Sequence, residues 1–380
     1  MIPEAERALG VKINLETISQ SDLPARTTAA IQSRRGADII MANDNASQLY
    51  AGACADVSDV SEAIASKQGD FYRAVKAHNY DGSRWQAVPF CIFGTLVVYR
   101  KSWFTEAGAT QFPTTWDNYR SVGRRLKSKG KPIGQSLGRA VGDAPAFWYP
   151  FFWSFGGREV EPDGKSVNLQ TRNVIESVKF ATAFCTDACD DGGLAWDNSG
   201  NNRAFLSSTV SATLNGSVIY LEAKRKPDRY LTDDGKPMMS DMLHATVPAG
   251  PAGQFSVHPT HNHMIMNYSS NVEPAKELLT WLSAPENYRP WFVAEGGFVC
   301  GATTMWEKDQ AWLSDPILTP FRDAPRTGQV YGYPGPSGQK AAEAISKFII
   351  VDMYAKAVQG MAAEDAVRWA EGELKKIYTA

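Results

Sequence analysis

Three of the chain's five histidines lie close together in the stretch VHPTHNHMIM, as His258, His261 and His263. Imidazoles at such short spacing are plausible ligands for zinc or copper, and a single imidazole can act as a general base. A structural zinc site would need further ligands, and this stretch holds no cysteine. A catalytic base would need a nucleophile or a paired acid. The pattern leaves three hypotheses: a metal site, a catalytic base, or the rim of a ligand-binding cleft.

Other signatures of catalysis are missing from the sequence. It contains no GxSxG elbow, no phosphate-binding GxxxxGK[ST] loop and no HExxH metal motif. The adjacent acids Asp190–Asp191 and Asp233–Asp234 fall in polar turns, which is typical of solvated surface. We therefore predict that the protein is not an enzyme and has no catalytic residue, no resident metal and no cofactor.

The composition is that of a folded protein with no large excess of either charge. The 380 residues carry a formal net charge of −2, with 43% hydrophobic and 21% charged residues, which is ordinary for a folded protein of two or three domains. Such a balance gives no electrostatic reason to expect nucleic acid as a partner. The five cysteines exclude a complete disulfide framework, but a bridge between Cys185 and Cys189 stays open.

Hydrophobic periodicity predicts helices that alternate with short strands, which indicates an α/β fold. The polar loop Asn43 to Ser47 follows a short apolar strand, and ligands collect beyond strand ends in such sheets. Thr114 and Asp117 stand in capping-box spacing at the start of a helix. Strands are predicted at residues 11–18, 37–42 and 95–99, and helices at 23–34, 102–107, 171–188 and 363–378.

Seven segments occur in an order that spans nearly the whole chain: ADII, DGSRWQAVPF, YRKSWFTEAG with FPTTWDNY, LNGSVIY, VPAGPAG, AKELLTWLSAPENY and AEDAVRWAEGELKKIY. No single segment is very specific. As an ordered set they resemble the extracellular solute-binding proteins of ABC importers, in the large bacterial family 1 that includes the maltose-binding type.

This resemblance implies a two-lobed periplasmic binding protein, type II-like, with the ligand cleft between the lobes. We expect lobe one at residues 1–101 and 262–312, and lobe two at 102–261 and 313–380. The resemblance also implies a hinge motion that encloses the solute and a closed form that the transmembrane permease subunits recognise. The strand that normally opens lobe one is missing here. We therefore expect a periplasmic or extracellular protein whose export signal is encoded upstream, through a late start or a truncation.

The resemblance also suggests ligand contacts by position. In such clefts, polar groups bond to hydroxyls and aromatic rings pack on the apolar faces of sugars. Because residues two apart share a face of a strand, His261 and His263 should point one way and Asn262 the other. We expect His261 and Asn262, at the turn into the strand, to reach the solute, and His263 to pack. The full expected set is Asp44, Asn45, Phe90, Trp153, Asn215, Ser217, His261, Asn262, Gly297 and Phe298.

The expected function is that of a monomeric substrate-binding component that delivers a sugar or sugar alcohol to an importer. The eleven Trp, 14 Tyr and 17 Phe suit a carbohydrate ligand, although most aromatic residues pack in cores. A cationic solute such as a polyamine or betaine is an alternative that would require carboxylates around an aromatic box. A metal-dependent hydrolase built around the histidines is the rival class, and a sensing receptor is a third possibility.

Overall fold

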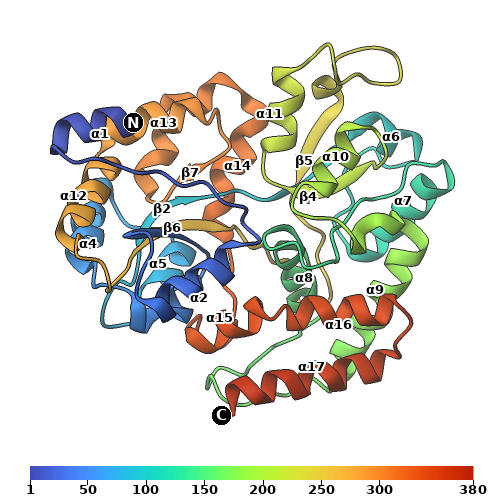
Figure 1. Ribbon diagram of the computed structural model, residues 1–380. Coiled ribbons are helices and arrows are strands. Elements are labelled where there is room, and N and C mark those ends of the chain that lie inside the picture. The colour runs from blue at the N-terminus through green and yellow to red at the C-terminus, as the bar shows by residue number, and fades with distance from the viewer. Residues whose placement is uncertain (380) are drawn as a thin grey trace. The chain divides into compact units, whose positions relative to one another are not determined.

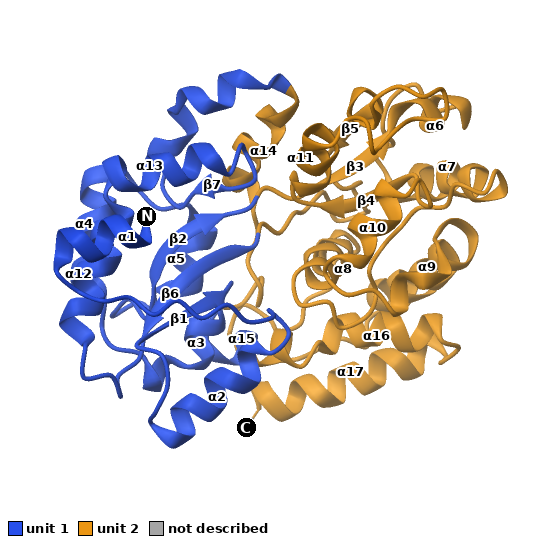
Figure 2. Cartoon of the chain, turned by 45° about the horizontal axis from the view of Figure 1, so that its top comes forward, with its two compact units in different colours: residues 1–93, 259–316, 337–342 blue, residues 94–258, 317–336, 343–380 orange. Residues whose placement is uncertain are grey.

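The structure is a computed structural model that describes residues 1–379, and the chain divides into two compact units (Figures 1 and 2). Unit 1 comprises residues 1–93, 259–316 and 337–342, and unit 2 comprises 94–258, 317–336 and the chain from 343 onward. The expected boundaries lie after residues 101, 261 and 312. Residues 94–101 belong to unit 2 because β3 pairs with two strands of that unit. The return of residues 337–342 to unit 1 had no signal in the sequence.

Unit 1 is built on a four-stranded sheet in the order β1-β6-β2-β7. β6 pairs antiparallel with β1 and with β2, and β2 pairs antiparallel with β7. In this register Asn43 lies opposite His261, and Ile92 lies opposite both Thr260 and Cys300. The last residues of β1 and β2 therefore lie beside the first residues of β6 and β7. We call this end of the four strands the sheet end of unit 1. The bounds are β1 (Ile39–Asn43), β2 (Val88–Ile92), β6 (Thr260–Ile265) and β7 (Cys300–Gly301).

Helices pack on this sheet and on one another. α3 contacts β1, α4 and α5 contact β2, and α12 contacts β6, α4 and α1. Alternation along β6 sends Asn262 and Met264 into the interior of the unit, where Met264 joins Ala42, Cys54, Ala87 and Met266 in a small apolar cluster. The helices are α1 (Ile2–Leu9), α2 (Leu23–Ser33), α3 (Ala46–Leu49), α4 (Ser58–Gln68), α5 (Arg73–Asn79), α12 (Val272–Ser283) and α13 (Pro285–Ala294).

Unit 2 has a three-stranded sheet in the order β4-β3-β5, with both pairs antiparallel. The strands are β3 (Leu96–Arg100), β4 (Ala212–Asn215) and β5 (Met242–Ala245). Leu96 lies opposite Asn215, so β4 ends beside the beginning of β3. The stretch Asn215 to Ser217 joins β4 to α11, which begins directly after Ser217.

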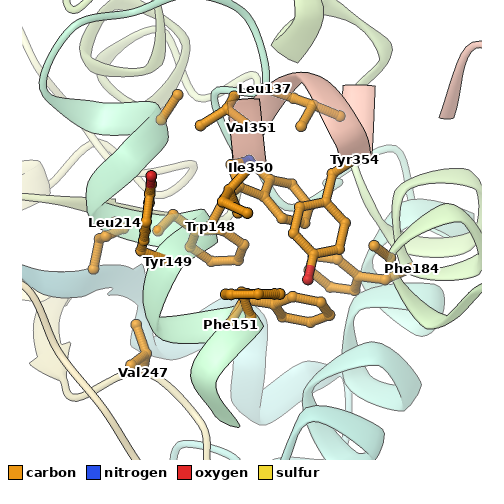
Figure 3. Close-up of a cluster of buried hydrophobic side chains, with 14 of the residues drawn as sticks. Leu137, Trp148, Tyr149, Phe151, Phe184, Leu214, Val247, Ile350, Val351 and Tyr354 are labelled. Atoms are coloured by element: carbon orange, nitrogen blue, oxygen red, sulfur yellow. The ribbon is translucent and has the colours of Figure 1, made fainter. Parts of the chain in front are cut away.

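The large core of unit 2 forms around α8, in which every residue from Ala144 to Ser154 is buried. A helix that is apolar on all sides can only be stable inside a core. Figure 3 shows Trp148 and Phe151 of this helix close to Tyr354 of α16, and the rings of Trp148 and Tyr354 stack with centroids 4.9 Å apart. The helices are α6 (Lys101–Glu106), α7 (Trp116–Ser128), α8 (Asp143–Ser154), α9 (Arg172–Ala188), α10 (Gly200–Leu206), α11 (Val218–Arg225), α14 (Thr319–Asp323), α16 (Ile349–Val358) and α17 (Ala363–Tyr378), while α15 (Gln339–Ser346) begins in unit 1.

Two local predictions are wrong. Residues 11–18 alternate like a strand but form none, because a strand needs a ladder partner. The backbone N–H of Ile13 donates instead to the carboxylate of Glu6. The cap of α7 is Thr115, one residue beyond the predicted Thr114. Its backbone is extended and its hydroxyl accepts from the backbone N–H of Asn118.

Two further features concern the pair Cys185 and Cys189 and the apolar character of the helices. Cys185 and Cys189 are both free thiols; Cys185 lies in the last turn of α9, and Cys189 follows the helix with an extended backbone. Within residues 1–379, no helix combines the length and the apolar character that crossing a membrane requires.

Candidate functional site

Asp44 lies at the point where β1 ends, and β6 fixes both its backbone and its side chain. Its backbone is left-handed, with φ of 48°, a conformation that Asp tolerates better than most residues. Its N–H donates to the carbonyl of Thr260 over 3.0 Å, and its Oδ1 accepts from the N–H of Thr260 over 2.9 Å. Burial raises the pKa of the Asp44 carboxyl to about 7, and the bond from Thr260 only partly offsets this effect. A carboxyl in this state can accept or donate a hydrogen bond near neutral pH.

Asn45 follows directly and is also buried. Its Nδ2 donates to the hydroxyl of Ser337 over 3.4 Å, across 292 residues of sequence. The short return of residues 337–342 to unit 1 therefore delivers a polar group to the loop that follows β1. Ser337 is absent from the expected set, since no local pattern in the sequence links it to this loop.

His261 lies at the same sheet end and belongs to an aromatic group with Phe93 and Phe298. The ring centroids of Phe93 and His261 are 4.6 Å apart, and those of Phe93 and Phe298 are 5.0 Å apart. Phe298 keeps partial exposure, whereas Phe93 is buried between its neighbours. Burial lowers the pKa of His261 to about 4, so its imidazole is neutral at physiological pH. Phe93 is absent from the expected set, although its position directly after VPFCI could have suggested it.

His263 and Phe90 pack against each other. The two ring centroids are 4.8 Å apart at an interplanar angle of 71°, and Phe90 also contacts Tyr288 and Trp291 of α13. Phe90 stands where the pairing of β2 with β6 shifts its register, which turns its ring onto α13. Both rings therefore have packing partners in unit 1.

Asn262 is fully buried, and both N–H donors of its amide are occupied. Its Nδ2 donates to the carbonyl of Asp44 and to the hydroxyl of Thr260, both over 3.1 Å, and its Oδ1 accepts from Asn79 over 2.8 Å. An asparagine side chain has two N–H donors, and both donors of Asn262 are occupied here. This geometry ties Asn262 to Asp44 and leaves Asn262 no free donor.

The histidine stretch does not form a metal centre in the part of the chain that the structure describes. No group of three or more His, Cys, Asp or Glu side chains there could hold an ion. His258 belongs to unit 2, where its Nδ1 accepts from the N–H of Thr95 and its Nε2 pairs with the hydroxyl of Ser256. Burial lowers the pKa of His258 and of His263 to about 4. Each histidine thus has a separate structural environment.

In unit 2, a polar group gathers where β4 ends and α8 begins. The Nδ2 of Asn215 donates to Asn202 over 2.6 Å and to Asp143 over 3.5 Å. Burial raises the pKa of the Asp143 carboxyl to about 7. Ser217 is fully buried at the start of α11. Asp143 and Asn202 were missed by the sequence analysis, although an acid in the first turn of a helix was a usable signal.

Trp153 and Gly297 complete the expected set. Trp153 is 1% exposed and lies in the core of unit 2, with ring contacts to Tyr149, Phe255 and Tyr333. Gly297 has a φ of 91°, which side chains rarely adopt, and it directs the backbone into Phe298. A separate cavity of about 300 Å³ in unit 2, lined by residues such as Thr95, Thr246 and His258, includes none of the expected ligand residues.

Comparison with known proteins identifies the family. The sequence profile of the bacterial extracellular solute-binding proteins matches residues 1–289. The chain belongs to this family. Its members are the solute-binding components of ABC transporters, as the sequence resemblance predicted, so a substrate-binding role is supported. A comparison with curated proteins gives no match.

Solved structures confirm the two-lobed α/β fold of this solute-binding family. An ABC transporter solute-binding protein from Agrobacterium radiobacter K84 in complex with ribitol has a TM-score of 0.81 and 17% identity, covering 99% of this chain and 94% of that chain. A solute-binding protein from Thermotoga lettingae TMO bound with α-D-tagatose has a TM-score of 0.83 and 16% identity, with the same coverage. Maltose-bound MalE3 from T. maritima has a TM-score of 0.80 and 16% identity, again over 99% and 94%. At these identities the likeness establishes the fold.

Proposed function

We propose that this protein captures a small neutral sugar or sugar alcohol and delivers it to the transmembrane subunits of an ABC importer. Family membership supports the solute-binding role, and several solved relatives carry ribitol, tagatose or maltose. The proposal places the protein in the periplasm or outside the cell, as a non-catalytic monomer. Enclosure of the solute by closure of two lobes stays a prediction.

The groups at the sheet end of unit 1 are the observation that supports a sugar or sugar alcohol as the ligand. A carboxyl at Asp44, an amide at Asn45 and the partly exposed ring of Phe298 lie at or next to this end. Carboxyl and amide groups bond to hydroxyls, and an aromatic ring covers the apolar face of a sugar. In unit 2, Asn215 and Asp143 offer polar groups of the same kind. We propose that Phe90, Trp153 and Asn262 stabilise the fold, since each packs against or bonds to residues of its own unit.

A neutral solute fits these groups better than a cationic one. Asp44 and Asp143 are the acids of the two groups, and burial raises the pKa of each to about 7, which reduces their negative charge at neutral pH. A polyamine would be recognised by fully ionised carboxylates around an aromatic box. A neutral polyol needs only hydrogen-bonding partners.

Isothermal titration calorimetry with ribitol, D-tagatose, maltose and spermidine tests the proposal. We expect at least one neutral probe to bind and to raise the melting temperature without being chemically altered. Asp44→Asn should weaken that binding by about tenfold, the scale of one hydrogen bond. Asp56→Asn is the matched control, because Asp56 is an exposed acid of unit 1 that accepts from Ser58 in a turn.

Three results would overturn the proposal: binding of spermidine alone, turnover of a probe, or no binding of any neutral probe to the folded protein. Unchanged affinity in Asp44→Asn would remove Asp44 from the site and leave the solute class standing.

A further inference from the structure

A buried polar network lies directly beneath the Asp44 turn. It contains Ser47 of α3, Asn79 of α5, and Thr260 and Asn262 of β6, all of them fully buried. The hydroxyl of Ser47 donates to Asn79 Oδ1 over 3.1 Å, and Asn79 Nδ2 donates to Asn262 Oδ1 over 2.8 Å. Asn262 then reaches the carbonyl of Asp44. The network thus connects two helices with the turn that follows β1.

The contacts of Asp44 show what this network does. Three hydrogen bonds hold the residue: its N–H donates to the carbonyl of Thr260, and its carboxylate and its carbonyl accept from Thr260 and Asn262, respectively. The left-handed backbone of a residue with a side chain is strained and persists only where surrounding contacts enforce it. The carbonyl contact from Asn262 restrains the peptide that follows Asp44. Asn79 in turn fixes the rotation of the Asn262 amide.

We infer that Asn262, held by Asn79, is a positioning residue that sets solute affinity by fixing the Asp44 turn, without touching the solute itself. This inference rests on the proposed function through the contact of Asp44 with the solute. It replaces the direct contact that the sequence suggested for Asn262. The Asn79–Asn262 pair lies in the interior of the unit, whereas the carboxyl that it orients lies at the sheet end.

A double-mutant cycle separates positioning from contact. The probe is the neutral compound that calorimetry identifies among ribitol, D-tagatose and maltose. In the wild-type background, Asn262→Ala should weaken its binding by about tenfold, the equivalent of ~1.4 kcal/mol. In the Asp44→Asn background the same substitution should change affinity by less than about twofold, because the carboxyl that it positions is gone. A direct contact between Asn262 and the probe would instead give losses that add, and additive losses overturn the inference.

Gln68→Ala is the matched control for lost stability. Gln68 is a buried amide of unit 1 that donates to the carbonyl of Ser283 and accepts from Trp306. Its removal should lower the melting temperature and leave affinity unchanged. Asn79→Ala is a second variant, expected to weaken binding by a smaller factor, since Asn262 keeps both of its own donor contacts. If both asparagine variants fail to fold while Gln68→Ala folds, the network serves the stability of unit 1 and the inference fails.

A readout without solute keeps this test distinct from that of the proposed function. Carbon-13 NMR can follow the titration of the Asp44 carboxyl in wild type and in Asn262→Ala. Loosening the turn should let water reach the carboxyl and move its pKa from about 7 toward the ordinary value of 3.8. An unchanged titration shows that the turn stands without Asn262 and overturns the inference. If the titration shifts but no sugar or polyol binds, the positioning of Asp44 holds and the proposed function fails.

Discussion

The hydroxyl of Tyr378 donates a hydrogen bond of 2.8 Å to Oε1 of Glu159, 219 residues earlier in the sequence. Glu159 is completely buried, and burial raises the pKa of its carboxyl to about 7. The contact attaches the end of α17 to the segment that follows α8. The C-terminal helix is therefore held to unit 2 through a carboxyl that is poorly suited to carrying charge.

Replacing Glu159 with Gln should stabilise the protein more at pH 8 than at pH 5. A carboxyl whose folded pKa lies above its unfolded pKa costs stability as pH rises from the unfolded value of about 4.3 through the folded value, here about 7. Glutamine carries no such charge, so the difference between variant and wild type should grow with pH. Urea unfolding at the two pH values measures it, and a difference independent of pH would contradict the prediction.

His258→Asn should destabilise the protein more at pH 7.5 than at pH 5. Burial lowers the pKa of His258 from 6.5 to about 4, so its stabilising contribution is complete above pH 6.5 and is lost as pH falls toward 4. At pH 5 wild type has already lost part of what the substitution removes. Denaturant midpoints at both values test this; an equal or larger loss at pH 5 would show that His258 carries no such linkage.

His261→Ala and His263→Ala form a matched pair on one face of β6. We expect His261→Ala to weaken solute binding several-fold and leave folding intact, because it removes the ring that supports Phe93 and, through it, Phe298. His263→Ala should lower stability by roughly 1 kcal/mol through its lost contact with Phe90 and leave affinity unchanged. Calorimetry and thermal unfolding of both variants decide this. Equal affinity in His261→Ala would return that residue to a structural role.

Trp153→Phe should leave solute affinity unchanged. The indole is buried in the core of unit 2, and its N–H has no hydrogen-bond partner among residues 1–379. Phenylalanine keeps the aromatic contacts and removes that unpaired donor, so the cost of the smaller ring, about 1–2 kcal/mol, is partly offset. A tenfold loss of affinity in a folded variant would place Trp153 in the ligand site.

Local periodicity predicted much of the fold. The β-branched run at residues 95–99 correctly gave a strand, β3, and the apolar repeat of residues 363–378 correctly gave a helix with a buried apolar face. These predictions hold because each depends on neighbours within a few residues. The predicted strand at 11–18 failed because a strand also needs a partner that its own residues do not specify.

The site depends on contacts that no local pattern encodes. Ser337 meets Asn45 across 292 residues, and Asn79 meets Asn262 across 183. Asn262 was therefore interpreted as a solute contact, although its donors are occupied within unit 1. Phe93 and Asp143 carried weak local signals, and only the folded chain shows which neighbours they have.

The left-handed backbone at Asp44 also limits how this site could change over evolution. Asp and Asn are the side chains that accept this conformation at the lowest cost, so an exchange between them would leave the turn intact and alter only the charge offered to a solute. Most other replacements would first have to reshape the turn. Position 44 is thus a place where solute preference could shift by a single codon while the surrounding architecture is inherited unchanged.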